Sequence, residues 1–209
     1  MSELVLLVGN KNTSSWSLRP WLALERSGLP RRTEVVHFGS SGWERVKKIS
    51  PTGKVPVLLD DDVVVWDSLA ICEYLAELAP ELWPKDRAMR AEARSIAAEM
   101  HSGFPNLRKQ LGMDLMARKD PGPLGPDVAA EIARVVAIWS SCRKRSGGPF
   151  LFGRFSIADA FYAPVATRFV TYGIDVPPDA RAYMDTVLSM PEMQAWTDDA
   201  RREVEAGIR

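Results

Sequence analysis

A run of hydroxyl side chains near the start of the chain is the first feature that could do chemistry. Between an apolar stretch and a helical pattern lies the segment Asn12-Thr13-Ser14-Ser15-Trp16-Ser17-Leu18-Arg19. A hydroxyl at a helix N-terminus is well placed to hold an anion such as a thiolate, because the helix dipole attracts negative charge there. Arg19, within the first turn, would add positive charge. Serine and threonine are also ordinary loop residues, so the pattern alone leaves both interpretations open.

A proline at the mouth of a predicted strand is the second feature, in the segment Ser50-Pro51-Thr52-Gly53-Lys54-Val55-Pro56-Val57-Leu58. A cis bond before Pro56 would turn the N–H and C=O of Val55 outward, where a peptide-like ligand pairs with them as an added strand. Only about 5–6 % of X-Pro bonds are cis, so the dipeptide alone favours a trans proline that opens an edge strand.

The third feature is Asp67-Ser68, directly before the apolar helical pattern Leu69-Ala70-Ile71-Cys72. Either residue is a good helix cap, and capping is the simpler interpretation. The same helix N-terminus also presents unpaired N–H groups that suit a ligand carboxylate. In that case Asp67 would face a ligand ammonium.

Several common catalytic and metal-binding patterns are missing. There is no G-x-G-x-x-G or G-x-S-x-G motif, and Gly53-Lys54 is followed by valine, so a phosphate-binding loop is not expected. His37 and His101 are the only histidines, which leaves little for a triad or a metal site. The two cysteines, Cys72 and Cys142, are widely spaced, so we expect neither a disulfide framework nor a metal.

The charge balance and the cysteine content restrict the partners and the compartment. Lys+Arg and Asp+Glu are 27 each, so no global field draws the chain to nucleic acid or acidic lipid. The apolar run 4–8 is too short for a signal peptide or a membrane span. Scarce cysteine fits a reducing compartment. We therefore predict a cytoplasmic protein with no nucleic-acid or membrane partner.

Hydrophobic periodicity divides the chain into two parts. In the first part, the pattern predicts the order β-α-β-α-β-β-α. The first helix follows the first strand and is expected to be capped by Ser17. The predicted strands cover 4–8, 33–38, 57–59 and 63–66, and the two later helices cover 43–49 and 68–78. The second predicts helices only, at 87–111, 127–144, 156–170, 179–189 and 191–205. We predict an α/β domain over 1–79, a linker over 80–86 and an all-helical domain over 87–209.

Together, the three features resemble the soluble glutathione S-transferase family, in order, spacing and over essentially the whole chain. The nearest pattern is that of the zeta class, Ser-Ser-Cys-x-Trp-Arg-x-x-x-Ala-Leu, where this chain reads Ser14-Ser15-Trp16-Ser17-Leu18-Arg19-Pro20-Trp21-Leu22-Ala23-Leu24. A Ser/Thr-x-x-Asp helix cap of the family matches Ser156 and Asp159, and Pro164 also falls where family members often have proline. The resemblance implies a thioredoxin-like N-terminal domain and an all-helical C-terminal domain.

The resemblance also implies roles for individual residues. In transferases of the serine type, a serine hydrogen-bonds the glutathione sulfur. Here that residue would be Ser14, with Ser15 as the near alternative and Arg19 adding positive charge. Val55, beside Pro56, would pair with the cysteinyl unit. The γ-glutamyl end would go to Asp67 and Ser68, and Lys54 is a further ligand contact. The second substrate is expected against Met100, Phe104 and Leu107, whose helical spacing equally fits core positions.

Two departures from the zeta pattern count against one activity, maleylacetoacetate isomerase. Trp16 stands where the pattern has cysteine, and Thr171 stands where those isomerases have an arginine. Arg168, one turn earlier, remains a substrate-binding candidate. No cysteine lies near Ser14, which argues against classes that form mixed disulfides with glutathione.

The resemblance predicts a glutathione transferase that activates the glutathione thiol as a thiolate for attack on a small hydrophobic electrophile. It also implies a homodimer, a detoxification role and no metal. Two alternatives stay open. One is a non-catalytic binding or interaction protein on the same scaffold. The other is a glutathione-dependent isomerase or dehalogenase, which would share the site and differ in the second substrate.

Overall fold

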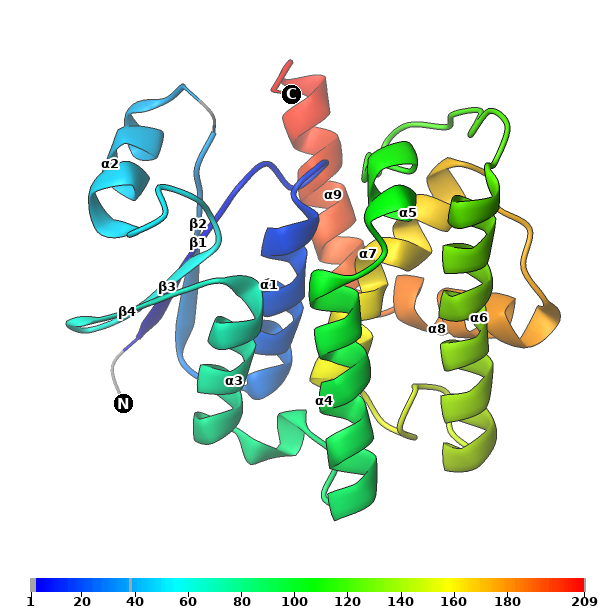
Figure 1. The fold of residues 1–209 in the computed structure, drawn as a ribbon. Helices are drawn as coiled ribbons and strands as arrows, with labels where there is room; N and C mark the ends of the chain where they lie inside the picture. The colour runs from blue at the N-terminus through cyan, green and yellow to red at the C-terminus, as the bar shows by residue number, and fades with distance from the viewer. Residues whose placement is uncertain (1–2, 38, 209) are drawn as a thin grey trace.

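The computed structural model describes residues 3–37 and 39–208. The first part of the chain forms a four-stranded sheet in the order β2-β1-β3-β4 (Figure 1). Its strands are β1 (Leu4–Val8), β2 (Arg31–Val35), β3 (Val57–Asp60) and β4 (Val63–Trp66). Strand β1 pairs parallel with β2 and antiparallel with β3, and β3 pairs antiparallel with β4. The predicted βαβαββα order is confirmed.

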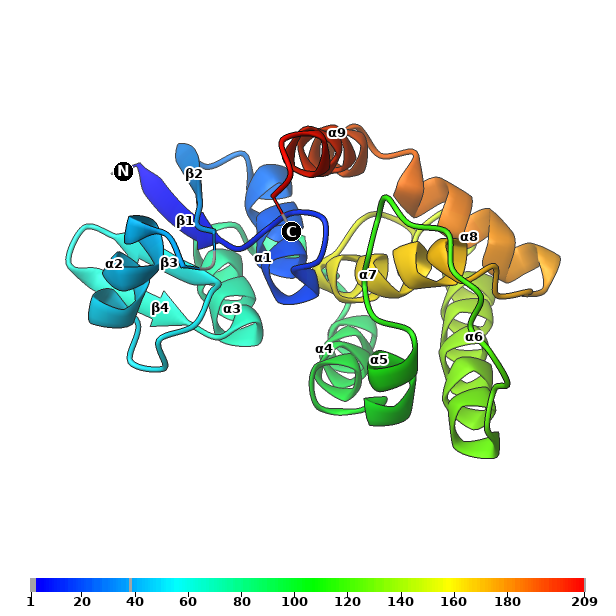
Figure 2. The same ribbon diagram turned by 90° about the horizontal axis from the view of Figure 1, so that it is seen from above.

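Helices cover both faces of this sheet, which is why β1 is an unbroken apolar run. Helices α1 (Ser15–Ser27) and α3 (Ser68–Leu78) lie on one face, where Leu6 and Leu58 join the main core. Helix α2 (Ser41–Ile49) lies on the other, where Val46 packs with Leu7 and Val57 (Figure 2).

In the rest of the described chain the regular elements are helices, apart from two isolated bridges near residue 152, and residues 111–125 form an irregular connection. A 3-10 turn, η1 (Pro80–Leu82), leads to the helices α4 (Arg87–Ser102), α5 (Pro105–Gln110), α6 (Pro126–Ser146), α7 (Ile157–Thr171), α8 (Pro178–Leu188) and α9 (Pro191–Glu205). Helix α7 is buried almost throughout and packs against α1, α4 and α8. Helix α9 runs beside α1 (Figure 2). The helical part therefore reaches the first turn of α1 from two sides.

Asp159 holds the start of α7. Its buried carboxylate accepts hydrogen bonds from the backbone N–H groups of Ser156 (2.8 Å) and Leu151 (3.0 Å) and from the Tyr183 hydroxyl (3.1 Å). The capping motif predicted from Ser156 and Asp159 is confirmed.

Two predicted elements are wrong in extent. Strand β2 covers 31–35 rather than 33–38, and Phe38 lies outside the described residues, as do 1, 2 and 209 at the ends of the predicted domains. The predicted helix 87–111 is broken after Ser102. Phe104 has φ 57°, and Pro105 starts a new helix because proline supplies no N–H and disfavours helical backbone before it.

The division into domains at 79 and 87 stays a prediction. Across the described part of the chain, no helix is both long enough and apolar enough to cross a membrane.

Candidate functional site

A cavity of about 350 Å³ opens where the loop before β3, the start of α3 and the first turn of α1 meet. Trp16 and Trp66 form apolar parts of its wall. Every residue that we expected to contact glutathione away from its sulfur lines this cavity: Lys54, Val55, Pro56, Asp67 and Ser68. Three segments that are distant in the sequence therefore line the same cavity.

The Val55–Pro56 peptide bond is cis. This is the less frequent isomer, and it is the one that ligand pairing beside the proline requires. Val55 lies in the cavity wall just ahead of β3, which starts at Val57. Its backbone is thus placed beside the ligand space.

The N-terminus of α3 forms another part of the cavity wall. Asp67 caps the helix, and its Oδ1 accepts hydrogen bonds from the N–H groups of Leu69 (2.8 Å) and Ala70 (3.3 Å). Its φ of 74° is unusual for a residue other than glycine. The Ser68 side chain is buried, and its hydroxyl has no hydrogen-bond partner among the described residues. A buried hydroxyl without a partner is a polar group still available to a ligand.

The serine turn approaches the cavity from a third side. Helix α1 begins at Ser15, so the predicted Ser17 cap is wrong. The Ser17 hydroxyl lies inside the first turn and accepts hydrogen bonds from the Gly9 N–H (3.0 Å) and from the Ser14 hydroxyl (2.8 Å). A Cβ at Gly9 would lie 3.1 Å from the Val55 side chain and 3.2 Å from Ser14 Oγ. Ser14 and Val55 therefore flank the same point, although Ser14 is outside the cavity lining.

Ser15 points toward the helical part of the chain. Its buried hydroxyl accepts a hydrogen bond from Arg168 Nη2 (3.1 Å). Arg168 also donates to the carbonyl of Leu111, at the end of α5. The structure thus brings Arg168 to the serine pair, whereas Thr171, one turn later, is bonded to the carbonyls of Asp114 and Thr167.

Three guanidinium groups gather behind Trp16. Arg19 is only 1 % exposed and lies between the rings of Trp16 (4.4 Å) and Phe161 (5.0 Å). Arg108 approaches the Trp16 ring as well (5.0 Å). Burial, together with Arg108 and Arg168, lowers the pKa of Arg19 to about 9, and burial with Arg108 lowers the pKa of Arg168 to about 10.

These three charges have little compensation. Within residues 3–37 and 39–208, no carboxylate forms a salt bridge with Arg19, Arg108 or Arg168. Nε and Nη1 of Arg19 are buried with no hydrogen-bond partner in the same residues. Uncompensated buried charge favours an anion nearby.

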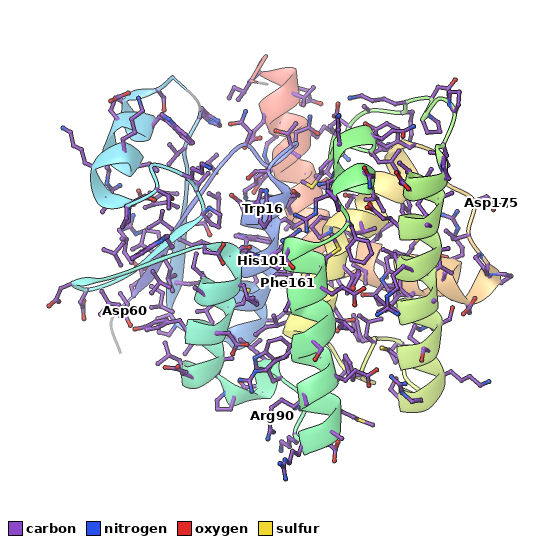
Figure 3. All side chains as sticks on the ribbon, viewed as in Figure 1. Trp16, Asp60, Arg90, His101, Phe161 and Asp175 are labelled. Atoms are coloured by element: carbon purple, nitrogen blue, oxygen red, sulfur yellow. The ribbon has the colours of Figure 1, made fainter. Side chains whose placement is uncertain are left out.

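Sequence reasoning overlooked Ser17, Arg108 and His101 as parts of this site. Figure 3 shows Trp16, His101 and Phe161 together between α1, α4 and α7. The His101 ring meets Trp16 edge-on at 5.4 Å. No local signal marks Arg108 or His101, because both reach the site only through side-chain contacts with Trp16, which is distant in the sequence.

The residues proposed for the second substrate lie in the core. Met100, Phe104 and Leu107 all belong to the main hydrophobic cluster and are almost fully buried. That is the core alternative noted from their spacing, and substrate contact stays a prediction. Across the residues described, no three or more His, Cys, Asp or Glu side chains are grouped to hold a metal ion.

Helix α9 fastens the loop that precedes the serine pair. Glu203 accepts hydrogen bonds from the N–H groups of Lys11 (2.7 Å) and Asn12 (3.4 Å), and Trp196 donates to the Lys11 carbonyl (2.7 Å). The Lys11 ammonium pairs with Asp199.

Glu203→Ala leaves two N–H groups without their acceptor, so we expect a loss of about 1–3 kcal/mol in the free energy of unfolding. Urea denaturation measures the loss, with Glu205→Ala, an exposed residue two positions on, as the control. Equal midpoints for the two variants would show that Glu203 does not hold the loop.

Two family models match the chain, the N-terminal domain of glutathione S-transferase over residues 13–78 and its C-terminal domain over 98–186. A probable maleylacetoacetate isomerase of Caenorhabditis elegans is 29 % identical over 171 residues, covering 80 % of this chain and 79 % of the worm protein. Glutathione S-transferase 1 of Dianthus caryophyllus is 29 % identical, covering 79 % and 77 %.

A solved structure supports the same relationship. A glutathione transferase homologue from Burkholderia, with bound glutathione, has a TM-score of 0.70 and 25 % identity, covering 96 % of this chain and 99 % of that one. The two family matches, the sheet order and the cis proline beside the α3 N-terminus agree: the chain belongs to the glutathione S-transferase family.

Proposed function

We propose that this glutathione transferase binds glutathione along Val55 and activates its thiol at the serine turn for attack on a small electrophile. One observation carries this proposal: the cis Val55–Pro56 bond and the α3 N-terminus line one cavity, and Ser14 flanks Val55 beside it. The cysteinyl backbone of glutathione pairs with Val55. The γ-glutamyl carboxylate lies at Ser68 and the helix N-terminus, and the γ-glutamyl ammonium lies at Asp67.

The energetic demand on the serine turn is modest. A free thiol with a pKa of about 8.5 is only a few per cent thiolate at pH 7. Lowering that pKa by about two units requires about 2.7 kcal/mol. A hydroxyl hydrogen bond to the anion contributes about 1.5–3 kcal/mol, and the helix N-terminus about 0.3–1 kcal/mol. Ser14 therefore acts by stabilising the sulfur anion. To do so, its hydroxyl donates its hydrogen bond to the sulfur instead of to Ser17.

In the reaction, the thiol proton leaves to water and the sulfur electron pair forms the new sulfur–carbon bond. With an aryl halide, the halide departs with the electrons of the broken bond. Ser14 keeps its own proton throughout. The proposed reaction needs no metal. We further propose that the protein acts as a cytoplasmic homodimer with a role in detoxification.

A calorimetric titration with glutathione tests the proposal, followed by turnover of a generic aryl halide. Binding and turnover support a transferase. Binding without turnover supports the non-catalytic alternative, and no binding at millimolar glutathione contradicts the assignment of the cavity.

A second candidate is a glutathione-dependent isomerase of an acidic substrate. The observation that favours it is the group of three arginines, Arg19, Arg108 and Arg168, none of which has a salt bridge among the described residues, with Arg168 bonded to Ser15. The worm relative carries the name of such an isomerase. Trp16 and Thr171 remain departures from the zeta pattern, so the arginine arrangement would have to replace the missing one.

For an acidic electrophile, we expect Arg168→Met to raise KM by about tenfold or more, because a hydrogen-bonded ion contact contributes about 1.5–3 kcal/mol. The KM for an uncharged aryl halide should change far less. Arg134→Met, which removes a surface arginine paired with Glu99, is the control. An equal rise in KM for both substrates would exclude charge recognition by Arg168.

A further inference from the structure

His101 reaches from the last turn of α4 to the wall of the proposed glutathione site (Figure 3). Its Nε2 lies 3.4 Å from Asp67 Oδ2, and its ring contacts Trp16 edge-on and lies 6.2 Å from Phe161. The charged groups that face it are Asp67 before α3, Arg19 on α1 and Arg108 on α5. One acid and two cations from three elements thus surround this histidine.

The two oxygens of Asp67 have different partners. Oδ1 accepts the N–H groups that begin α3, and Oδ2 faces His101. Oδ1 is therefore occupied by the hydrogen bonds of the helix cap, and Oδ2 is the oxygen that can bind a ligand ammonium. His101 and the γ-glutamyl ammonium meet at the same atom.

The geometry favours one protonation state of the free protein. A neutral ring whose Nε2 lies 3.4 Å from a carboxylate oxygen carries its proton on Nε2, toward Oδ2. Nδ1 is then unprotonated, which fits its burial without a partner in the described residues. A doubly protonated ring would bury an N–H with no acceptor. Burial lowers the pKa of His101, and Arg19 and Arg108 lower it further against the opposing effect of Asp67.

We propose that His101 is a positioning residue for the γ-glutamyl group of glutathione. Neutral His101 holds Asp67 Oδ2 in place for the ligand ammonium. Protonated His101 forms an ion pair with that oxygen and repels the ammonium. This role rests on the proposed glutathione site and adds a residue of the helical part to it.

This role predicts the direction in which glutathione affinity changes with pH. The ammonium and the protonated ring compete for one carboxylate, so each weakens the binding of the other by the same factor. Affinity for the γ-glutamyl group is therefore full above the pKa of His101 and falls as the pH drops through it. With the pKa of His101 lowered below its usual 6.5, we expect a loss of about twofold to eightfold between pH 7 and pH 5.5.

The probe is S-methylglutathione, which keeps the ammonium but has no thiol to titrate. Calorimetry across pH 5.5–7.5 compares the wild type with His101→Gln, whose amide reaches Oδ2 without titrating. The chain has two histidines, so His37→Gln is the matched control. Between pH 7 and pH 5.5 the wild type and His37→Gln should lose about twofold to eightfold in affinity, and His101→Gln should stay nearly constant. The same slope in His101→Gln as in the wild type would overturn the proposal.

A ligand change gives a second test that needs no variant. The S-methyl analogue in which glutaryl replaces γ-glutamyl lacks the ammonium, so its affinity for the wild type should not fall at low pH through His101. A slope that persists with this analogue contradicts competition at Asp67. Failure of S-methylglutathione to bind at pH 7.5 removes the glutathione site itself, whereas binding without any pH slope removes only the role of His101.

Discussion

Ser14→Ala is expected to lower kcat/KM for glutathione conjugation at pH 6.5 by about 10- to 100-fold. The lost hydroxyl hydrogen bond to the thiolate contributes about 1.5–3 kcal/mol, and about 1.4 kcal/mol corresponds to a factor of ten. The same loss should raise the pKa of the bound thiol by about one to two units. Ultraviolet absorbance of the bound thiolate, followed against pH, measures that pKa directly.

Two neighbouring variants make this result specific. Thr13→Ala removes an exposed hydroxyl one residue earlier and should leave the thiol pKa unchanged. Ser15→Ala removes the acceptor of Arg168 and should change the pKa less than Ser14→Ala does. If Ser15→Ala has the larger effect and Ser14→Ala keeps full turnover, Ser15 is the residue that holds the sulfur.

Asp159→Ala should have the largest effect on stability, a loss of about 3–5 kcal/mol in the free energy of unfolding. Its carboxylate is fully buried and accepts from Ser156, Leu151 and Tyr183. Removing a buried, hydrogen-bonded charge leaves all of these donors unpaired, and each buried donor costs about 1–3 kcal/mol. Urea denaturation monitored by tryptophan fluorescence gives the difference.

Asp127→Ala is the matched control, because Asp127 also lies in the first turn of a helix but is exposed. Its loss should be below about 1 kcal/mol, the contribution of an acid at a helix N-terminus. Similar losses for the two variants would mean that burial of Asp159 adds nothing to ordinary capping.

The candidate site follows from the sequence where its signals are local. A helix cap, a proline at a strand mouth and a serine turn each need only a few neighbouring residues, so Asp67, Pro56 and Ser14 could be named without a structure. The family resemblance then supplied what no single motif carries, namely that the three belong to one ligand site. The cis state of Pro56 was an open alternative until the backbone was known.

The end of helix α4 is a feature that the sequence pattern places too late in the chain. Apolar residues continue at helical spacing past Ser102, yet Gly103 cannot take a side chain, because a Cβ there would lie 2.6 Å from the Glu99 carbonyl. Phe104 then adopts a positive φ that periodicity does not reveal. This break turns α5 back so that Arg108 donates to the His101 carbonyl (2.9 Å).

By itself, the sequence predicted most of the order of the strands and helices, the balance of charge, the cap at Asp159 and a cap at Asp67 or Ser68. The family resemblance added five residues that line the ligand cavity: Lys54, Val55, Pro56, Asp67 and Ser68. Only the tertiary structure decided that Arg19 lies between two aromatic rings, that Arg168 reaches Ser15, and that His101 faces Asp67. The physical reason is the range of the interactions. Caps and periodicity act within a turn or two of the chain, whereas these contacts form only when α7 packs against α1 and α4 packs against α3.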